Sequence, residues 1–245
     1  MDNMVKVFNY SAASRKRLIC IPYAGGYSAA FKPLETELRG DWQVVSVDPP
    51  GHGSNPEPLL NNLEALVQLY LDRLRTYFKP PFVLFGHSMG GKIVHRMAQQ
   101  LELAGVSPAA VIVSGCPAPD CPPAVYKDDQ ALLKHVASFG GIPEELLRYG
   151  PFIDYFLPIL RADYDAIATY ICPSEQRLKA PLHVFYGTED SVFTREDAAS
   201  WLKWAERVEA AAFAGGHLFV QHQADELAGR IRIILNYVKE GIPTR

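Results

Sequence analysis

Several features that would assign a function class are missing from this sequence. Its 24 lysines and arginines and 27 aspartates and glutamates form no block of like charges and no basic face, which argues against binding to nucleic acid or an anionic membrane. The longest uncharged run, residues 103–119, is broken by glycine and proline and is too mildly apolar to span a bilayer. The cysteines match neither a zinc-binding spacing nor a C-x-x-C pair, so we expect buried, reduced thiols and no metal site. These are Cys20, Cys116, Cys121 and Cys172.

A secretory signal is also missing. The first ten residues, MDNMVKVFNY, contain no apolar stretch of the kind that a signal peptide needs, so we expect a cytoplasmic protein. The 245 residues are enough for one large α/β domain or two small ones.

Six short runs typical of strands recur along the chain, and helical patterns lie between them. They cover residues 17–22, 43–50, 82–86, 109–115, 182–187 and 208–213. The central runs are almost wholly apolar, as in parallel strands that are covered on both faces. This alternation predicts an α/β fold with a mostly parallel, doubly wound sheet.

One segment interrupts this alternation. Residues 120–176 carry only helical patterns, and they fall between two predicted strands. We therefore expect a helical lid inserted into a single domain that spans residues 1–245. An enlarged crossover that only covers the sheet edge is the alternative.

A serine stands at a predicted strand-to-helix turn. Gly86-His87-Ser88-Met89-Gly90 fits the pattern G-x-S-x-G, with a strand run before it and a helical pattern after it. Side chains two residues to either side of such a serine would collide with backbone, which explains the glycines. The following helix directs its N-terminus toward the reacting centre, where it favours a developing negative charge. We predict that Ser88 is a nucleophile; a structural serine in a turn is the alternative.

A serine nucleophile needs a base, and His217 is the histidine that we favour. The stretch FAGGHLFV places it on a glycine-rich loop between a strand and the C-terminal helix. His52, in PPGHGSN at the same sheet edge, is its rival. We expect His87 to support the turn, and His95 and His183 to be structural.

An acid must hold the imidazole in the correct tautomer and stabilise the imidazolium. The stretch FYGTEDSVF follows a strand and offers Glu189 and Asp190, of which we favour Asp190 at the tip of the turn. Asp120, after the preceding strand, is the alternative acid. With Asp190 the three groups follow the chain order Ser, Asp, His that this motif carries.

Two backbone donors complete the predicted site. One is the N–H of Met89, which directly follows the nucleophile. The other comes from the glycine-containing loop IPYAGGYSAAF, and we select the N–H of Ala24, with an ordinary glycine turn as the alternative. These groups suit acyl transfer through an acyl-enzyme.

Six stretches, in order along the chain, resemble the type II thioesterases of the α/β-hydrolase superfamily. They are PYAGG, PGHG, GHSMGG, LPILRADYDAIATY, YGTED and GGHLF, and the likeness runs over roughly residues 17–238. Type II thioesterases are editing enzymes of nonribosomal peptide and polyketide biosynthesis. The LRADY stretch, together with PYAGG and GHSMGG, makes the resemblance specific.

The resemblance implies an α/β-hydrolase fold and a cytoplasmic enzyme that hydrolyses acyl thioesters from the phosphopantetheine arms of acyl or peptidyl carrier proteins. Carried over by position, the triad is Ser88, Asp190 and His217, and the oxyanion donors are Ala24 and Met89. No cofactor is implied, because the phosphopantetheine belongs to the substrate, and a monomer is the default expectation.

The resemblance has one departure and leaves rival functions open. Many family members carry arginine where this chain has His52 and Asn55, which puts in doubt any carrier or substrate contact assigned to that loop. A medium-chain fatty acyl thioesterase and a general carboxylesterase would use the same triad. A non-enzymatic binding protein of this fold would typically lack one triad member, whereas all three positions are filled here.

Overall fold

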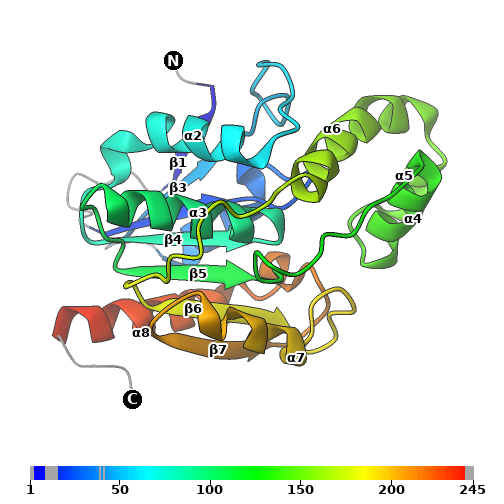
Figure 1. The fold of residues 1–245 in the computed structure, drawn as a ribbon. Helices are drawn as coiled ribbons and strands as arrows, with labels where there is room; N and C mark the ends of the chain where they lie inside the picture. The colour runs from blue at the N-terminus through cyan, green and yellow to red at the C-terminus, as the bar shows by residue number, and fades with distance from the viewer. Residues whose placement is uncertain (1–2, 9–15, 39, 41, 241–245) are drawn as a thin grey trace.

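A single seven-stranded sheet forms the centre of the molecule, as Figure 1 shows. The structure, a computed structural model, describes residues 3–8, 16–38, 40 and 42–240. The strands are β1 (Val5–Phe8), β2 (Lys16–Ile21), β3 (Trp42–Val47), β4 (Phe82–His87), β5 (Ala110–Ser114), β6 (Leu182–Gly187) and β7 (Val208–Phe213). Their order is β1-β3-β2-β4-β5-β6-β7, and every neighbouring pair is parallel except β1 with β3.

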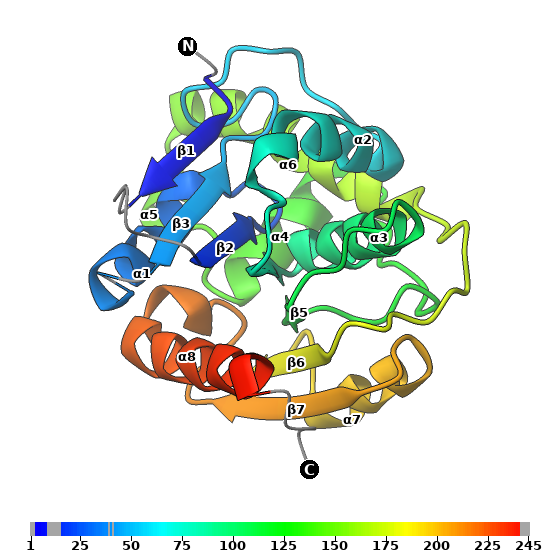
Figure 2. The same cartoon turned by 90° about the vertical axis from the view of Figure 1, so that its left-hand side faces the viewer.

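Helices cover both faces of the sheet (Figure 2). The α-helices are α1 (Lys32–Glu37), α2 (Leu63–Arg73), α3 (Met89–Leu103), α4 (Asp129–Ser138), α5 (Glu144–Leu147), α6 (Gly150–Ala168), α7 (Arg195–Ala198) and α8 (Ala224–Glu240). In Figure 2, α1 and α8 lie on one side of the sheet and α2 and α3 on the other. Short 3₁₀ helices are η1 (Ser28–Phe31), η2 (Arg75–Tyr77), η3 (Ala199–Lys203) and η4 (Phe219–Gln221).

Side chains that alternate along the strands build two separate cores. In β4, Leu84 packs with α2 and α3 on one face, whereas Val83 and Phe85 pack with α1 and α8 on the other. A strand buried on both faces needs apolar residues at every position, which is why the central strands read as continuous apolar runs. The prediction of a doubly wound, mostly parallel α/β sheet is confirmed.

The six predicted strands all form, and β6 and β7 have the predicted bounds. Strand β1 was missing from the prediction. It is only four residues long, partly buried throughout, and pairs antiparallel with β3 at the edge, so its sequence lacks a long apolar run.

Helices α4, α5 and α6 lie between β5 and β6 in the chain and beyond the ends toward which the β5 and β6 arrows point (Figure 1). We call residues 120–176, which contain these helices, the insert. The insert has its own apolar cluster, centred on Leu132, Val136, Ile142 and Leu160. It therefore packs as a unit over one edge of the sheet.

The cysteines differ in part from the prediction. All four thiols are free, and Cys20 and Cys116 are buried. Cys121 and Cys172 are partly exposed, so the expectation of burial is wrong for them. They lie where the chain enters and leaves the insert, and they pack against the margin of the core on the α2 and α3 face of the sheet. In the described part of the chain, we find no helix that is both long and apolar enough to cross a membrane.

Candidate active site

Ser88 occupies a strained turn between β4 and α3. Its backbone has φ 52° and ψ −116°, and it is the only non-glycine residue with positive φ among the described residues. Such a conformation costs on the order of 1–3 kcal/mol and persists only where the surroundings impose it. It places Ser88 at the carboxyl end of β4, directly before the first residue of α3.

The glycines on either side of Ser88 are required by close backbone contacts. A Cβ at Gly86 would lie 2.0 Å from the carbonyl oxygen of Gly90, and a Cβ at Gly90 would lie 2.1 Å from the carbonyl oxygen of Ile21. Any side chain would therefore displace backbone, which is the steric reason for the pattern. The second contact also brings the loop after β2 against the start of α3.

His217 and Asp190 form a buried pair. The imidazole Nδ1 lies 2.8 Å from Asp190 Oδ2, and the two side chains are 3% and 0% exposed. Asp190 Oδ1 accepts the backbone N–H groups of Val192 and Phe193 at 2.7 and 3.1 Å, which fixes the carboxylate. With Nδ1–H donating to Asp190, the other ring nitrogen, Nε2, has its lone pair free to accept a proton.

Glycines let the loops that carry this acid and base approach each other. A Cβ at Gly187 would lie 2.5 Å from the carbonyl oxygen of Gly215 and 2.6 Å from that of Gly216. The N–H of Glu189 donates to the carbonyl of Gly215 at 2.9 Å. The GG sequence before His217 therefore serves to seat its loop against the loop of Asp190.

The His217 ring also reaches the serine turn. Its centroid lies 5.1 Å from that of His87, the residue before Ser88, and a Cβ at Gly115 would be 2.9 Å from the His87 ring and 3.2 Å from the His217 ring. His87 is buried and its Nδ1 shares a 2.9 Å hydrogen bond with Ser114 Oγ. Burial lowers the pKa of His87, so a neutral ring supports the turn.

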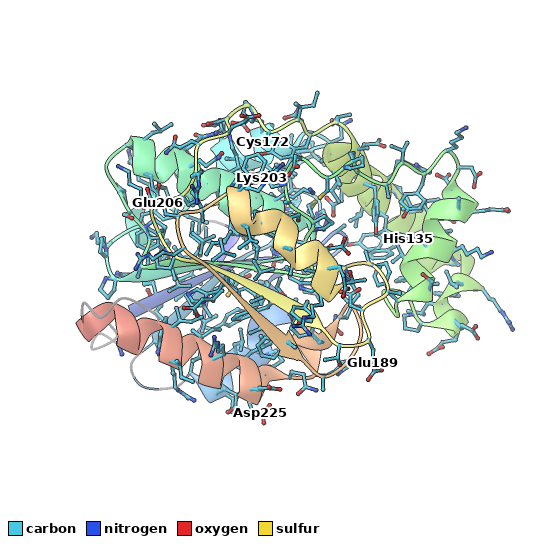
Figure 3. All side chains as sticks on the ribbon, turned by 60° about the horizontal axis from the view of Figure 1, so that its bottom comes forward. His135, Cys172, Glu189, Lys203, Glu206 and Asp225 are labelled. Atoms are coloured by element: carbon cyan, nitrogen blue, oxygen red, sulfur yellow. The ribbon has the colours of Figure 1, made fainter. Side chains whose placement is uncertain are left out.

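Both rival residues for the triad are engaged elsewhere. Asp120 pairs with Lys203, which Figure 3 labels, and accepts the indole N–H of Trp204 at 2.8 Å. His52 is buried against Asp163, with 3.0 Å between Nε2 and Oδ2. Of the two neighbouring acids after β6, Glu189 is exposed (Figure 3).

The remaining histidines of the prediction lie away from this pair. Burial lowers the pKa of His95 to about 3, and its ring stands edge-on to Trp201 at 5.2 Å between centroids. His183 lies inside β6 and faces Glu209 of β7, with 3.5 Å between Nδ1 and Oε2. Both sit within the packed body of the protein.

Two backbone N–H groups are available for an oxyanion. Met89 is the first residue of α3, where N–H groups have no partner within the helix. Ala24 lies in a turn closed by a 2.8 Å hydrogen bond from the Gly26 N–H to the Tyr23 carbonyl. The Tyr23 ring is 5.7 Å from that of His87, so this turn adjoins the serine turn. Within the described residues, neither the Met89 nor the Ala24 N–H donates a hydrogen bond.

Sequence reasoning missed two contacts from the insert. Phe139 stands edge-on to the His217 ring at 4.9 Å between centroids, and Asp163 of α6 accepts the Gly25 N–H at 2.6 Å. Asp163 is a charged residue in the LRADY stretch. It stands between the buried Ala162 and Tyr164, which packs against the apolar cluster of the insert. A charge at such a position was a usable signal, but its partners lie more than 100 residues earlier in the chain.

A serine held at a strand-to-helix turn, with a buried histidine–aspartate pair on later loops of the same sheet edge, is the arrangement of the α/β-hydrolases. Among the described residues, no three or more His, Cys, Asp or Glu side chains are grouped to hold a metal ion. The fold and this arrangement of side chains are those of an α/β-hydrolase.

Comparison with known proteins narrows this class. The family model described as "Thioesterase domain" matches residues 16–235, and the chain belongs to this family. A "Probable cadicidin biosynthesis thioesterase" of Streptomyces griseus is 32% identical over 223 residues, with 89% of this chain and 62% of that protein covered. "Thioesterase TesA" of Mycobacterium marinum is 32% identical over 229 residues, with 88% and 89% covered.

The solved structure of the type II thioesterase BorB from the borrelidin biosynthetic cluster has the same fold. It matches with a TM-score of 0.86 and 28% identity, over 96% of this chain and 98% of that chain. The resemblance to type II thioesterases that the sequence motifs indicated is confirmed, as is the α/β-hydrolase fold. The protein is a type II thioesterase, an enzyme that hydrolyses thioesters.

Proposed function

We propose that this thioesterase removes acyl groups from the phosphopantetheine arms of carrier proteins in nonribosomal peptide or polyketide biosynthesis, with Ser88, His217 and Asp190 as its triad. The observation that carries the proposal is the strained turn at Ser88 beside the 2.8 Å His217–Asp190 pair. The names of similar proteins support a role in a biosynthetic pathway, since one is a probable cadicidin biosynthesis thioesterase and another comes from the borrelidin biosynthetic cluster.

The geometry supports a two-step mechanism. Ser88 Oγ attacks the thioester carbonyl carbon while His217 Nε2 takes the hydroxyl proton, and the N–H groups of Ala24 and Met89 hold the oxyanion. Collapse breaks the C–S bond, and His217 returns the proton to the departing sulfur. Water, activated by the same imidazole, then hydrolyses the Ser88 ester and releases the carboxylic acid.

The insert is proposed to act as a lid that forms one wall of the acyl pocket. Phe139 covers His217, while Phe156 and Leu160 of α6 approach the turn that holds Ala24. A Cβ at Gly25 would lie 2.7 Å from the Phe156 ring and 2.9 Å from Leu160 Cδ2. These apolar side chains therefore adjoin both the base and the proposed oxyanion donor.

Replacing Phe156 with alanine is expected to shift the preference of the enzyme toward longer acyl chains. Removing the ring enlarges the wall next to Gly25, and a pocket discriminates one methylene by about 1–3 kcal/mol. The measurement is kcat/KM for a series of acyl-pantetheine thioesters of increasing length. Leu147→Ala is the matched control, because Leu147 packs in the same apolar cluster from α5. A uniform loss of activity with unchanged preference in Phe156→Ala would contradict the assignment of the pocket wall.

The proposed action on carrier-bound acyl groups is tested directly by comparing two substrates with the same acyl group. We expect kcat/KM for an acyl group on a holo-carrier protein to exceed that on a pantetheine analogue by at least about tenfold, roughly 1.4 kcal/mol of transition-state stabilisation. Contacts remote from the reacting carbon can be used to orient it, so a truncated substrate loses kcat as well as affinity. Equal efficiency on both, with faster hydrolysis of simple oxygen esters, would identify a general esterase instead.

A further inference from the structure

The turn that carries Ala24 is held by a carboxylate of the insert. Asp163 of α6 is 2% exposed, and its Oδ2 accepts both the Gly25 N–H at 2.6 Å and His52 Nε2 at 3.0 Å. Gly25 has φ +76° and is the third residue of the turn closed between Tyr23 and Gly26. Its N–H belongs to the central peptide of that turn, which the turn's own hydrogen bond leaves without a partner. Asp163 supplies that partner from outside.

Helix α6 also packs on the same turn. Leu160 and Phe156 lie about one and two turns before Asp163 on this helix, and both would contact a Cβ at Gly25. The orientation of the peptide between Ala24 and Gly25 therefore depends on where α6 sits. The Ala24 N–H lies in the adjoining peptide, between Tyr23 and Ala24, so a shift of α6 that moves this turn would also displace the Ala24 N–H.

Both ring nitrogens of His52 face acceptors. Nε2 faces Asp163 Oδ2, and Nδ1 lies 2.9 Å from the carbonyl oxygen of Pro50. A neutral imidazole can donate only one of these hydrogen bonds, so only the protonated ring satisfies both. A protonated His52 also compensates the charge of Asp163, which would otherwise be buried without a cation.

The surroundings favour this protonated form. Burial by itself lowers the pKa of His52, but the hydrogen bond and charge of Asp163, the Pro50 carbonyl and the charge of Asp48 together raise the pKa above its ordinary value. Burial also raises the pKa of Tyr70 and of Tyr164, the other titratable groups near Asp163, so both hydroxyls stay neutral.

We propose that Asp163 and His52 are positioning residues for the oxyanion hole: their buried ion pair fastens α6 to the turn of Ala24, so that the hole is ordered only while the insert is docked. The inference rests on the proposed role of Ala24. Docking of the insert over the acyl group would then also order the oxyanion hole, because the Asp163 carboxylate belongs to the insert and binds the turn of Ala24.

The ion pair has a defined pH dependence. Because the pKa of His52 is raised in the folded protein, the pair's stabilisation is complete below the unfolded value of about 6.5 and is lost as pH rises through the folded value. Activity should therefore decline on the alkaline side as His52 loses its proton.

The experiment compares pH profiles of kcat and KM for the wild type, Asp163→Asn and His52→Arg on one acyl-pantetheine thioester. The oxyanion forms only in the transition state, so Asp163→Asn should lower kcat by about 10- to 100-fold with KM changed less than about threefold. His52→Arg keeps a cation at every pH and should remove the alkaline decline. Asp129→Asn is the control: it breaks the ion pair of Arg161, also on α6, and should change kcat less than about twofold.

Two outcomes separate this inference from the proposed function. A wild type that does not hydrolyse thioesters overturns the function itself. If the wild type does hydrolyse thioesters, either of two results overturns only the positioning role. One is a kcat of Asp163→Asn within twofold of the wild-type value, and the other is the same alkaline decline in folded His52→Arg.

If both variants misfold, hydrogen exchange of the wild type decides. After correction for intrinsic rates, protection of segments covering residues 23–26 and 150–168 should fall between about pH 6 and about pH 9. Unchanged protection in both segments would overturn the inference.

Discussion

Ser88→Ala is expected to lower kcat for thioester hydrolysis by about 10⁵- to 10⁶-fold, the scale seen when a triad nucleophile is removed. The change deletes the attacking oxygen and leaves the proposed oxyanion donors in place. Alanine keeps a Cβ at the strained φ of 52°, so the turn is no more strained than with serine and the fold should persist. The measurement is single-turnover hydrolysis of an acyl-pantetheine thioester.

The control for this variant is Ser138→Ala, an exposed serine of α4 that should leave kcat within about twofold. Thermal unfolding of both variants checks that the fold is retained. Wild-type-like turnover by folded Ser88→Ala would remove the nucleophile from the mechanism.

Asp190→Asn is expected to lower kcat by up to about 10⁴-fold. An asparagine can still accept the N–H groups of Val192 and Phe193 through its carbonyl oxygen, so the loop should keep its shape. Its amide N–H would instead donate to His217 Nδ1. The proton of the neutral imidazole would then lie on Nε2, the nitrogen that must accept the proton of Ser88. The measurement is kcat on the same thioester, with the thermal midpoint recorded alongside.

Asp120→Asn is the matched control for the acid. Asp120 bonds Lys203 and Trp204 and makes no described contact with His217, so its removal should change kcat by less than tenfold, equivalent to about 1.4 kcal/mol. If Asp120→Asn proved severely impaired and Asp190→Asn nearly normal, the acid would be the one that follows β5.

The sequence carried enough information for the sheet and for the serine turn. Apolar runs report strands that are buried on both faces, which is why β6 has the predicted bounds. The glycines around Ser88 report close backbone contacts, of Gly86 with Gly90 and of Gly90 with Ile21. Strand β1 has neither signal, because it is short and lies at the edge.

The contacts between the insert and the site could not be predicted in the same way. His52 could be placed at the correct sheet edge, but not paired with Asp163, which is 111 residues later in the chain. Whether a loop histidine is a base or half of an ion pair depends on which groups face its two nitrogens. The same limit applies to Phe139, whose contact with His217 depends on how the insert docks.

The proposed mechanism requires that one activated nucleophile, Ser88, carries out the hydrolysis. Titration with a serine-directed fluorophosphonate, followed by peptide mapping and residual thioester hydrolysis, tests this claim most directly. We expect the label on Ser88 alone, at up to one equivalent per chain, with activity lost in proportion to labelling. Full activity in protein labelled at Ser88, or loss of activity with the label on a different residue, would contradict it.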